Sequence, residues 1–307
     1  MKKILVIYFS QSGQLTQALQ ATLAPLEKCN EISICYEQIK PKTPFPFPWT
    51  YTQFFNVFPE CVHGVACEIE PLSTQSKENF DLIIIAYQPW FLSVSIPINS
   101  FLQSEEGKKI IADKNIITII ACRNMWLNAQ EKMKLAIKNA GGRLQGNIAF
   151  VDDAPNLVSL ITVLAFVLAG IKGRFLGLFP KFGVSAKTLG LTAPKFGEII
   201  LRFLTGENSV PLQQSLNEAG AHRIKSNLLL LEQRGGVLFP LYANYIAKME
   251  SGNSRGRLLR VRIFGILLPT AVLFLSPIIT LISRIAPLIW KNSFKKEVEY
   301  YSGNALR

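Results

Sequence analysis

The sequence is poor in the residues that build disulfide frameworks and metal centres. It holds five cysteines and two histidines in 307 residues. An odd and small number of cysteines does not make a disulfide framework in a chain of this length. Cys61, His63 and Cys67 offer three zinc ligands, but a closed zinc site needs four and no second pair stands near them. We therefore expect a reducing, cytoplasmic compartment and no metal.

Acidic residues are scarce, above all toward the C-terminal end. The formal net charge is +12, and residues 255–307 carry nine basic side chains against two acidic ones. These basic residues flank a long apolar run and do not line a polar groove, which argues against nucleic acid as a partner. An anionic membrane surface accounts for both the charge and the apolar run.

The first turn of the chain lacks two common nucleotide-binding patterns, the Lys-Ser/Thr of NTPase loops and the G-x-G-x-x-G of dinucleotide folds. The apolar run before it, residues 4–9, is short, so we expect no secretory signal peptide. This strand pattern leads into a small polar turn and then into a helix pattern. Such a turn directs backbone N–H groups toward an anion, Ser10 and Ser12 add hydroxyl donors, and Gly13 lets the backbone approach closely. The turn therefore predicts a phosphate site.

Residues 10–15 resemble the FMN-phosphate loop of flavodoxins, roughly S-x-T-G-N-T. The resemblance implies FMN as the cofactor and contacts from Ser10, Gln11, Ser12, Gly13, Gln14, Leu15 and Thr16. Ser12, Gln14 and Leu15 depart from the pattern, and Leu15 removes a hydroxyl that Thr16 can replace. The alternative is a small-residue turn that binds no ligand.

Strand and helix patterns alternate through the first half of the chain. After residues 4–9, the predicted strands are residues 31–39, 80–87, 115–122 and 143–151. The predicted helices are residues 14–28, 97–103 and 128–140. This alternation predicts an α/β fold with a five-stranded parallel sheet in the flavodoxin-like order 2-1-3-4-5. In that order a ligand lies at the carboxyl ends of strands one, three and four.

The loops after the third and fourth strands supply the remaining candidate cofactor contacts. They are Gln88, Pro89, Trp90, Phe91, Cys122, Arg123, Asn124, Met125 and Trp126. In flavodoxins these two loops hold the isoalloxazine ring, so Trp90 or Trp126 is expected to stack on it and Arg123 or Asn124 to face its N1/O2 edge. The alternative is that both tryptophans cap the end of the domain. Tyr87 and His63 are the candidates for a catalytic base.

A segment rich in proline and aromatic residues, residues 41–51, separates the second and third predicted strands, and Phe54, Phe55 and Phe58 follow it. Its prolines exclude an interior strand and predict an extended conformation. We expect the segment either to cover the flavin or line an apolar substrate channel, or to pack on the second half of the chain.

The second half has another composition. Residues 156–171 are uncharged and predict a buried helix, and further helical patterns cover residues 198–204 and 209–249. The tetrad Pro-Lys-Phe-Gly occurs at residues 180–183 and 194–197 and predicts a repeated turn. We expect three parts: a flavodoxin-like FMN-binding domain over residues 1–153, a helical apolar region over 154–254 that packs on it, and a membrane-interacting segment over 255–307.

Residues 263–283 are uncharged and long enough to cross a bilayer. Basic residues stand on both sides of this run: Arg255, Arg257, Arg260, Arg262, Arg284, Lys291, Lys295 and Lys296. Positive charge at both ends conflicts with the positive-inside tendency, and Pro269 and Pro277 would kink a span. We therefore expect an interfacial or re-entrant helical hairpin on the cytoplasmic side. The alternatives are a single span and a soluble core helix.

Two stretches, YFSQSGQ at residues 8–14 and DLIIIAYQPWFLSVSIPINSF at residues 81–101, resemble the dialkylresorcinol condensing enzymes. These are flavodoxin-like bacterial proteins encoded beside ketosynthases, so the resemblance implies a ketosynthase partner. It also implies flavin-dependent oxidation of a dialkyl cyclohexanedione to the aromatic dialkylresorcinol, a hydrophobic substrate. The alternatives are a membrane-peripheral flavodoxin-like quinone reductase and a flavin-free membrane scaffold for biosynthetic partners, which Leu15 favours.

Overall fold

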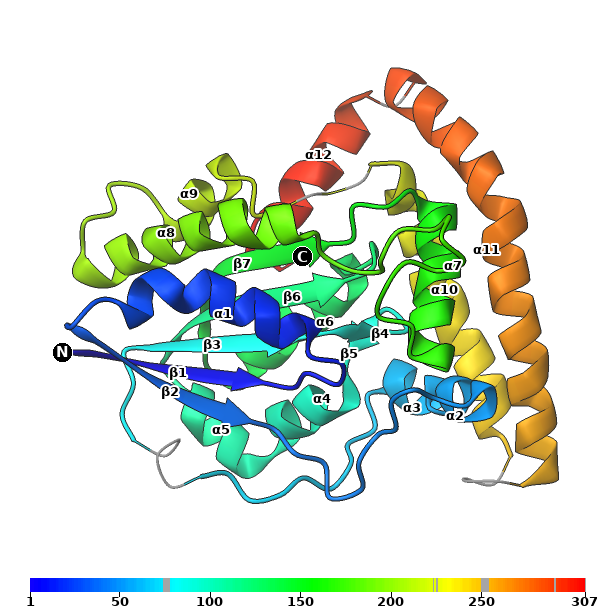
Figure 1. Ribbon diagram of the computed structural model, residues 1–307, viewed down its shortest axis with the longest axis horizontal. Helices are drawn as coiled ribbons and strands as arrows, with labels where there is room; N and C mark the ends of the chain where they lie inside the picture. The colour runs from blue at the N-terminus through cyan, green and yellow to red at the C-terminus, as the bar shows by residue number, and fades with distance from the viewer. Residues whose placement is uncertain (74–77, 223, 225, 250–253, 290, 307) are drawn as a thin grey trace.

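A parallel β-sheet with helices on both faces forms the centre of the computed structural model (Figure 1). The structure describes residues 1–73, 78–222, 224, 226–249, 254–289 and 291–306. The sheet order is β2-β1-β3-β6-β7. The strands are β1 (Lys2–Tyr8), β2 (Ile32–Gln38), β3 (Leu82–Tyr87), β6 (Asn115–Cys122) and β7 (Arg143–Val151). All four neighbouring pairs are parallel, which confirms the predicted order.

The helices of the first half alternate with the strands. They are α1 (Gln14–Glu27), α2 (Tyr51–Asn56), α3 (Phe58–His63), α4 (Ile96–Gln103), α5 (Glu105–Ile111) and α6 (Leu127–Asn139). A short hairpin, β4 (Pro89–Trp90) with β5 (Ser93–Val94), follows β3. Helix α2 is not among the predicted elements, because the prolines of residues 41–51 suggest an extended segment. It begins with a capping box between Thr50 and Gln53, which satisfies its first backbone N–H groups.

The second half is helical. It contains α7 (Asn156–Ala169), the π-helical turn η2 (Thr188–Thr192), α8 (Ala193–Thr205), α9 (Leu212–Glu218), α10 (Ser226–Ala247), α11 (Arg255–Ile289) and α12 (Lys291–Tyr301). The helical pattern at 209–249 is two helices rather than one. The second Pro-Lys-Phe-Gly tetrad forms the start of α8, so the prediction of a repeated turn is wrong there. Pro194 stands in the first turn of that helix, where its missing N–H costs no hydrogen bond.

Helix α8 completes the layer on one face of the sheet, beside α1. Phe196 and Ile200 are buried against residues of α1 and the sheet. Gly197 lies so close to α1 that a Cβ there would stand 2.0 Å from the carbonyl oxygen of Thr22. The sheet layer thus includes a helix that lies well beyond residue 153, the expected end of the flavodoxin-like domain.

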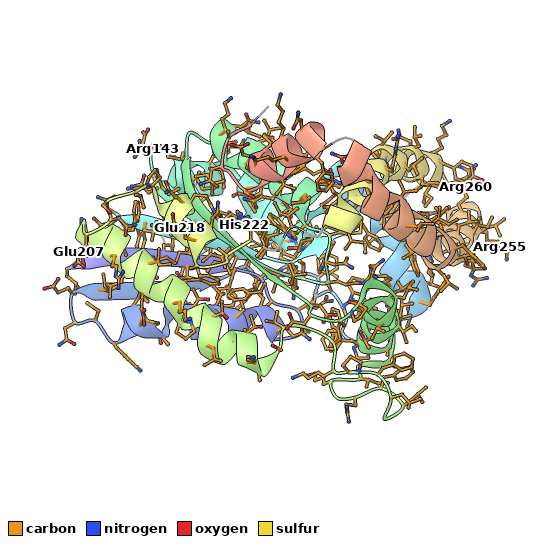
Figure 2. The ribbon with its side chains drawn as sticks, turned by 90° about the horizontal axis from the view of Figure 1, so that it is seen from above. Arg143, Glu207, Glu218, His222, Arg255 and Arg260 are labelled. Carbon is orange, nitrogen blue, oxygen red and sulfur yellow. The ribbon has the colours of Figure 1, made fainter. Side chains whose placement is uncertain are left out.

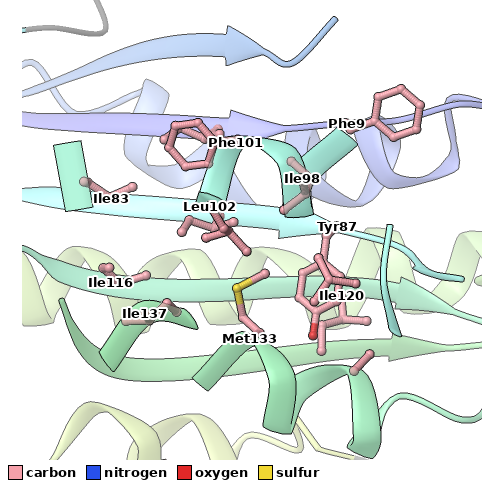
Figure 3. Packing of buried hydrophobic residues seen from close by; sticks show 14 of the residues in the cluster. Phe9, Ile83, Tyr87, Ile98, Phe101, Leu102, Ile116, Ile120, Met133 and Ile137 are labelled. Atoms are coloured by element: carbon pink, nitrogen blue, oxygen red, sulfur yellow. The ribbon is translucent and has the colours of Figure 1, made fainter. Parts of the chain in front are cut away.

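The other face of the sheet is covered by α4 and α6. Phe101 and Ile98 of α4 and Met133 and Ile137 of α6 pack on isoleucines of β3 and β6, and all are buried (Figure 3). Because helices cover both faces, the central strands are apolar at nearly every position, as in the segment Leu82–Tyr87. Burial of this kind is what makes these strands recognisable in the sequence.

Helix α11 runs without a break along one edge of the molecule, and α12 returns from its end toward the sheet (Figure 1). The hairpin expected at residues 263–283 is therefore wrong, because the chain does not reverse there. Pro269 removes one backbone hydrogen bond, and a proline can bend a helix without reversing it. By length and composition the part Arg255–Leu275 could cross a membrane, with a mean hydropathy of 2.0. The side chains of Arg284 and Lys291 lie outside the described residues.

Candidate functional site

A cavity of about 170 Å³ lies at the carboxyl ends of β1, β3 and β6, where the strand order predicts a ligand. Its polar lining consists of Gln11, Ser12, Gln14, Gln88, Cys122 and Arg123. Its apolar lining consists of Phe47, Trp49, Phe54, Val57, Pro89, Trp90, Phe91, Ala121, Val163, Phe166, Val167 and Phe182. Polar groups from three strand ends thus face a largely apolar wall.

The turn after β1 leads directly into the N-terminus of α1. Gly13 has a φ of +87°, and no atom beyond its chain neighbours lies within 4 Å of the place where a Cβ would stand. It precedes the first residue of α1, whose early backbone N–H groups have no partner within the helix. The hydroxyl of Ser10 accepts a hydrogen bond from the Thr16 N–H at 3.4 Å, which closes the turn. Leu15 is fully buried in the core and contributes no contact to the cavity.

Two glutamines of this turn hold the segments that cover the cavity. Gln11 Nε2 donates to the carbonyl oxygen of Pro46 at 2.6 Å, and Gln14 Nε2 donates to that of Phe182 at 3.0 Å. The first bond fixes the proline-rich segment, and the second fixes the loop after α7. Both covering segments are therefore attached directly to the predicted phosphate loop.

The proline-rich segment lies between the cavity and α7. Phe47 and Trp49 line the cavity. The same segment packs on α7, since the rings of Phe47 and Phe166 lie 5.0 Å apart and the Trp49 N–H donates to the carbonyl oxygen of Val167 at 2.9 Å. We call the α7 residues Val163, Phe166 and Val167 the roof of the cavity. Nothing local in the sequence identifies them, because they reach the site only through this packing.

The two candidate tryptophans differ in their surroundings. Trp90 lines the cavity, and the rings of Phe45 and Trp49 meet it edge-on at 5.2 and 5.8 Å. Trp126 is buried, with 1% of its surface exposed, and its ring lies 5.3 Å from that of His222. Trp126 does not line the cavity, so of the two tryptophans Trp90 is the one placed to stack on a ligand ring.

Arg123 is the charged side chain of the cavity. Its Nη2 donates to the backbone oxygen and the Oδ1 of Asn156 at 2.6 and 2.7 Å. Its Nε is buried and has no hydrogen-bond partner among the described residues. Burial lowers the pKa of Arg123 to about 10, while Asp152 acts in the opposite direction, so the side chain stays charged at neutral pH.

Asn124 and Met125, which follow Arg123 in the chain, do not line the cavity. Asn124 is buried and donates to Asn156 Oδ1 at 2.6 Å, so it holds α7 in place rather than facing a ligand. From this loop only Cys122 and Arg123 reach the cavity. The expectation that Asn124 faces a bound ring is wrong.

The two proposed catalytic bases lie away from the cavity. Tyr87 is fully buried, and its hydroxyl donates to Gln130 Oε1 at 2.8 Å on the α6 face of the sheet (Figure 3). Burial raises its pKa well above the usual value. His63 is exposed at the end of α3. Neither side chain lines the cavity, so neither is placed to act as a base on a ligand bound there.

Comparison with known proteins gives likenesses of fold only. No family model and no curated protein matches this chain. A flavoprotein from Lactobacillus acidophilus, solved in complex with FMN, covers 48% of this chain and 93% of its own, with 16% identity and a TM-score of 0.39. A putative flavoprotein from Bacteroides eggerthii has 18% identity and a TM-score of 0.37, and the match covers 48% of this chain and 88% of that protein. A putative flavoprotein from Bacteroides uniformis has 16% identity and a TM-score of 0.37, and the match covers 49% of this chain and 90% of that protein. The fold is flavodoxin-like. That conclusion rests on the strand order β2-β1-β3-β6-β7 and on the loop between β1 and α1.

Proposed function

We propose that this protein is an FMN-dependent oxidoreductase. The observation that carries the proposal is the meeting, in one cavity, of the turn at the start of α1 with the strand-end residues Gln88 and Arg123. Arg123 is the one charged residue among the described residues of the lining, and no carboxylate is found there. Such a site favours a phosphate at the turn and an electron-rich ring edge near the arginine.

The residues present fit FMN. The loop around Gly13 is open in front, and Ser10 and Ser12 offer hydroxyls beside its backbone N–H groups. The partnerless Nε of Arg123 is a buried donor that a ligand oxygen or nitrogen would satisfy. Trp90 supplies an aromatic wall. When bound, FMN would supply the hydride acceptor.

We further propose an amphiphilic, alkylated ring as the substrate, oxidised from a dialkyl cyclohexanedione to a dialkylresorcinol. The roof and the aromatic lining around Phe47 and Phe54 support this, because they offer apolar surface for alkyl chains. This oxidation removes one hydride, which FMN would accept when bound, and one proton. No carboxylate, histidine or tyrosine lines the described cavity, so water would take the proton, and Arg123 would stabilise the enolate oxygen.

The first test is the absorption spectrum of the purified protein, followed by identification of the released flavin. We expect stoichiometric FMN. The bound flavin should then be reduced by a dialkyl cyclohexane-1,3-dione without a nicotinamide nucleotide and yield the resorcinol. A requirement for a nicotinamide nucleotide and a quinone would favour the quinone reductase instead. A colourless protein that takes up no FMN would refute both enzyme functions and leave the flavin-free membrane scaffold as the remaining hypothesis.

The phosphate loop has a variant pair that separates charge from backbone strain. Gly13→Asn keeps a residue that tolerates a positive φ, and Gly13→Asp adds a negative charge at the same place. We expect Gly13→Asp to lose FMN and Gly13→Asn to retain part of it. Gly173→Asp is the control, since Gly173 also has open space around it but lies in the loop after α7 and not in the turn before α1. Equal FMN content in all three variants would refute the site.

The partners and the location are also part of the proposal. The excess of basic residues at 255–307 supports work at an anionic membrane surface, on the cytoplasmic side. The ketosynthase partner stays a prediction from family resemblance.

A further inference from the structure

An apolar stripe runs along the outer side of α11. Its residues are spaced three, four or seven positions apart, which places them on one side of the helix, and between 43% and 67% of each is exposed. The stripe consists of Leu259, Ile263, Ile266, Leu267, Leu273, Phe274, Ile278, Leu281 and Ile282. At 1.5 Å per residue it is about 35 Å long. Monomeric soluble proteins rarely expose so long a continuous apolar surface, so the α11 stripe marks an interaction site.

The charges around the stripe are positive. The sequence of α11 has no acidic residue, and Arg255 and Arg262 are exposed on it. Figure 2 shows Arg255 and Arg260 together at one end of the molecule, whereas Glu207 and Arg143 lie toward the other. An apolar helix face bordered by arginines is complementary to the acyl chains and anionic headgroups of a lipid leaflet.

The beginning of α11 is fixed to the flavodoxin-like part. Arg257 is 3% exposed; its Nη2 lies 2.7 and 2.9 Å from the two carboxylate oxygens of Glu60, and its Nε donates to Asn56 Oδ1 at 2.8 Å. Further along the helix, Phe264 stacks on Phe58 of α3, with ring centroids 3.9 Å apart. The inner side of the helix is thus held by α2 and α3.

The chain beyond α11 returns to the same part. In α12 the Tyr300 hydroxyl donates to Glu131 of α6, and Lys134 Nζ lies 4.9 Å from the centroid of the Tyr300 ring. Lys134 also donates to the carbonyl oxygen of Ala305 at 3.2 Å. The segments at both ends of α11 are therefore attached to the same folded body. A helix that crosses a bilayer has its ends on opposite sides, so this arrangement argues against a single span.

We propose that α11 lies flat in the headgroup region of an anionic phospholipid leaflet, with its stripe inserted, as a monotopic membrane anchor. This placement brings the cavity near the lipid. Phe54 lines the cavity and lies 5.0 Å from Phe55, which in turn lies 6.1 Å from Phe264 of α11. If the proposed function holds, on which this one step rests, an alkylated ring passes from the leaflet to the cavity without crossing water.

The test is flotation of the purified full chain with vesicles of phosphatidylcholine alone and with roughly one-third phosphatidylserine. We expect binding to the second kind. The variant Ile266→Asp with Phe274→Asp places charges on the stripe, and we expect its binding to fall more than about tenfold. Leu135→Asp is the matched control, because Leu135 is also an exposed apolar residue but lies on α6, and its binding should stay unchanged. Unchanged flotation of the double Asp variant would overturn the proposal.

Charge and topology are tested separately. Arg255→Gln with Arg262→Gln should weaken binding to the phosphatidylserine vesicles and reduce its dependence on salt. Alkaline carbonate should release the protein from the vesicles, and retention in the membrane would show a span and overturn the flat arrangement. The wild-type protein could also form a dimer without detergent. If the double Asp variant is then monomeric and binds vesicles as wild type does, a second copy of the chain covers the stripe, and the proposal is overturned.

The membrane anchor and the flavin enzyme can fail independently. We expect the double Asp variant to keep its FMN, because its two substitutions are exposed and outside the cavity. A colourless wild-type protein that floats with the vesicles would refute the proposed function and leave the anchor in place. A protein that contains FMN but does not float with the vesicles would refute the anchor and leave the proposed function in place.

Discussion

The carboxylate of Glu232 on α10 lies at the start of α6, where its Oε1 accepts a hydrogen bond from the Asn128 N–H at 3.0 Å. The Asn128 side chain donates in return to the carbonyl oxygen of Glu232 at 2.7 Å. The first N–H groups of a helix need acceptors from outside it, and here they come from a distant helix. Burial raises the pKa of Glu232 to about 8, although hydrogen bonds from these N–H groups oppose the shift.

This pKa makes the free energy of unfolding depend on pH. The folded protein keeps on Glu232 a proton that the unfolded chain releases above its ordinary pKa of 4.5. The stabilisation is full below that value and is lost as the pH rises through about 8. Between pH 6.5 and 8 we expect a loss on the order of 2 kcal/mol, measured by urea unfolding. Glu232→Gln should remove this fall in unfolding free energy between pH 6.5 and 8. Glu218→Gln, at an exposed position, should not. If the unfolding free energy of the wild type does not change between pH 6.5 and 8, the raised pKa of Glu232 is contradicted.

His222 has the opposite pH dependence. Burial, and then Lys134, lower its pKa from 6.5 to about 4, and its ring packs against Trp126. The stabilisation from the neutral ring is full above pH 6.5 and is lost as the pH falls through about 4. We expect the difference in unfolding free energy between wild type and His222→Gln to shrink as the pH falls across this range. His63→Gln, at an exposed position, should leave the acid limb as in wild type. A difference that stays constant with pH would show that His222 does not cause the effect.

The sequence predicts the sheet well because its signal is local. The ranges 115–122 and 143–151 coincide with β6 and β7, since strands buried on both faces are continuous apolar runs that end at turns. The turn before α1 is likewise a local feature of the sequence, and its Gly13 has a positive φ. These features need no knowledge of what packs against them.

The wrongly predicted site residues are those whose position depends on tertiary packing. Trp90 and Trp126 follow neighbouring strands in similar loops, yet only Trp90 reaches the cavity, since α6 and His222 enclose Trp126. The Tyr87 side chain, at the end of β3, points to the α6 face because side chains alternate along a strand. The roof on α7 is contributed by a helix whose sequence carries no sign of a site. Chain order alone does not determine such contacts.

The close contact between α1 and α8 gives a packing prediction. Gly197→Ala would place a methyl group 2.0 Å from the Thr22 carbonyl oxygen, so the helices must separate. We expect a loss of about 2–3 kcal/mol in the free energy of unfolding, measured with urea. Gly190→Ala is the control, because beyond its own chain neighbours and helix backbone no atom of the described residues lies within 4 Å of its Cβ position. It should change stability by less than about 1 kcal/mol. Equal effects would show that α8 does not pack on α1 as described.

The ion pair between Arg257 and Glu60 gives the last prediction. Arg257→Met keeps the length of the side chain but leaves Glu60 and Asn56 without their partner, so we expect a loss of about 2–3 kcal/mol. Hydrogen exchange at Val261, which is buried one turn further along α11, should accelerate. Arg262→Met is the matched control, because that arginine is exposed on the same helix and should change stability by less than about 0.5 kcal/mol. If the two variants are equally stable, the start of α11 is held by its apolar contacts alone, and the ion pair does not anchor the helix.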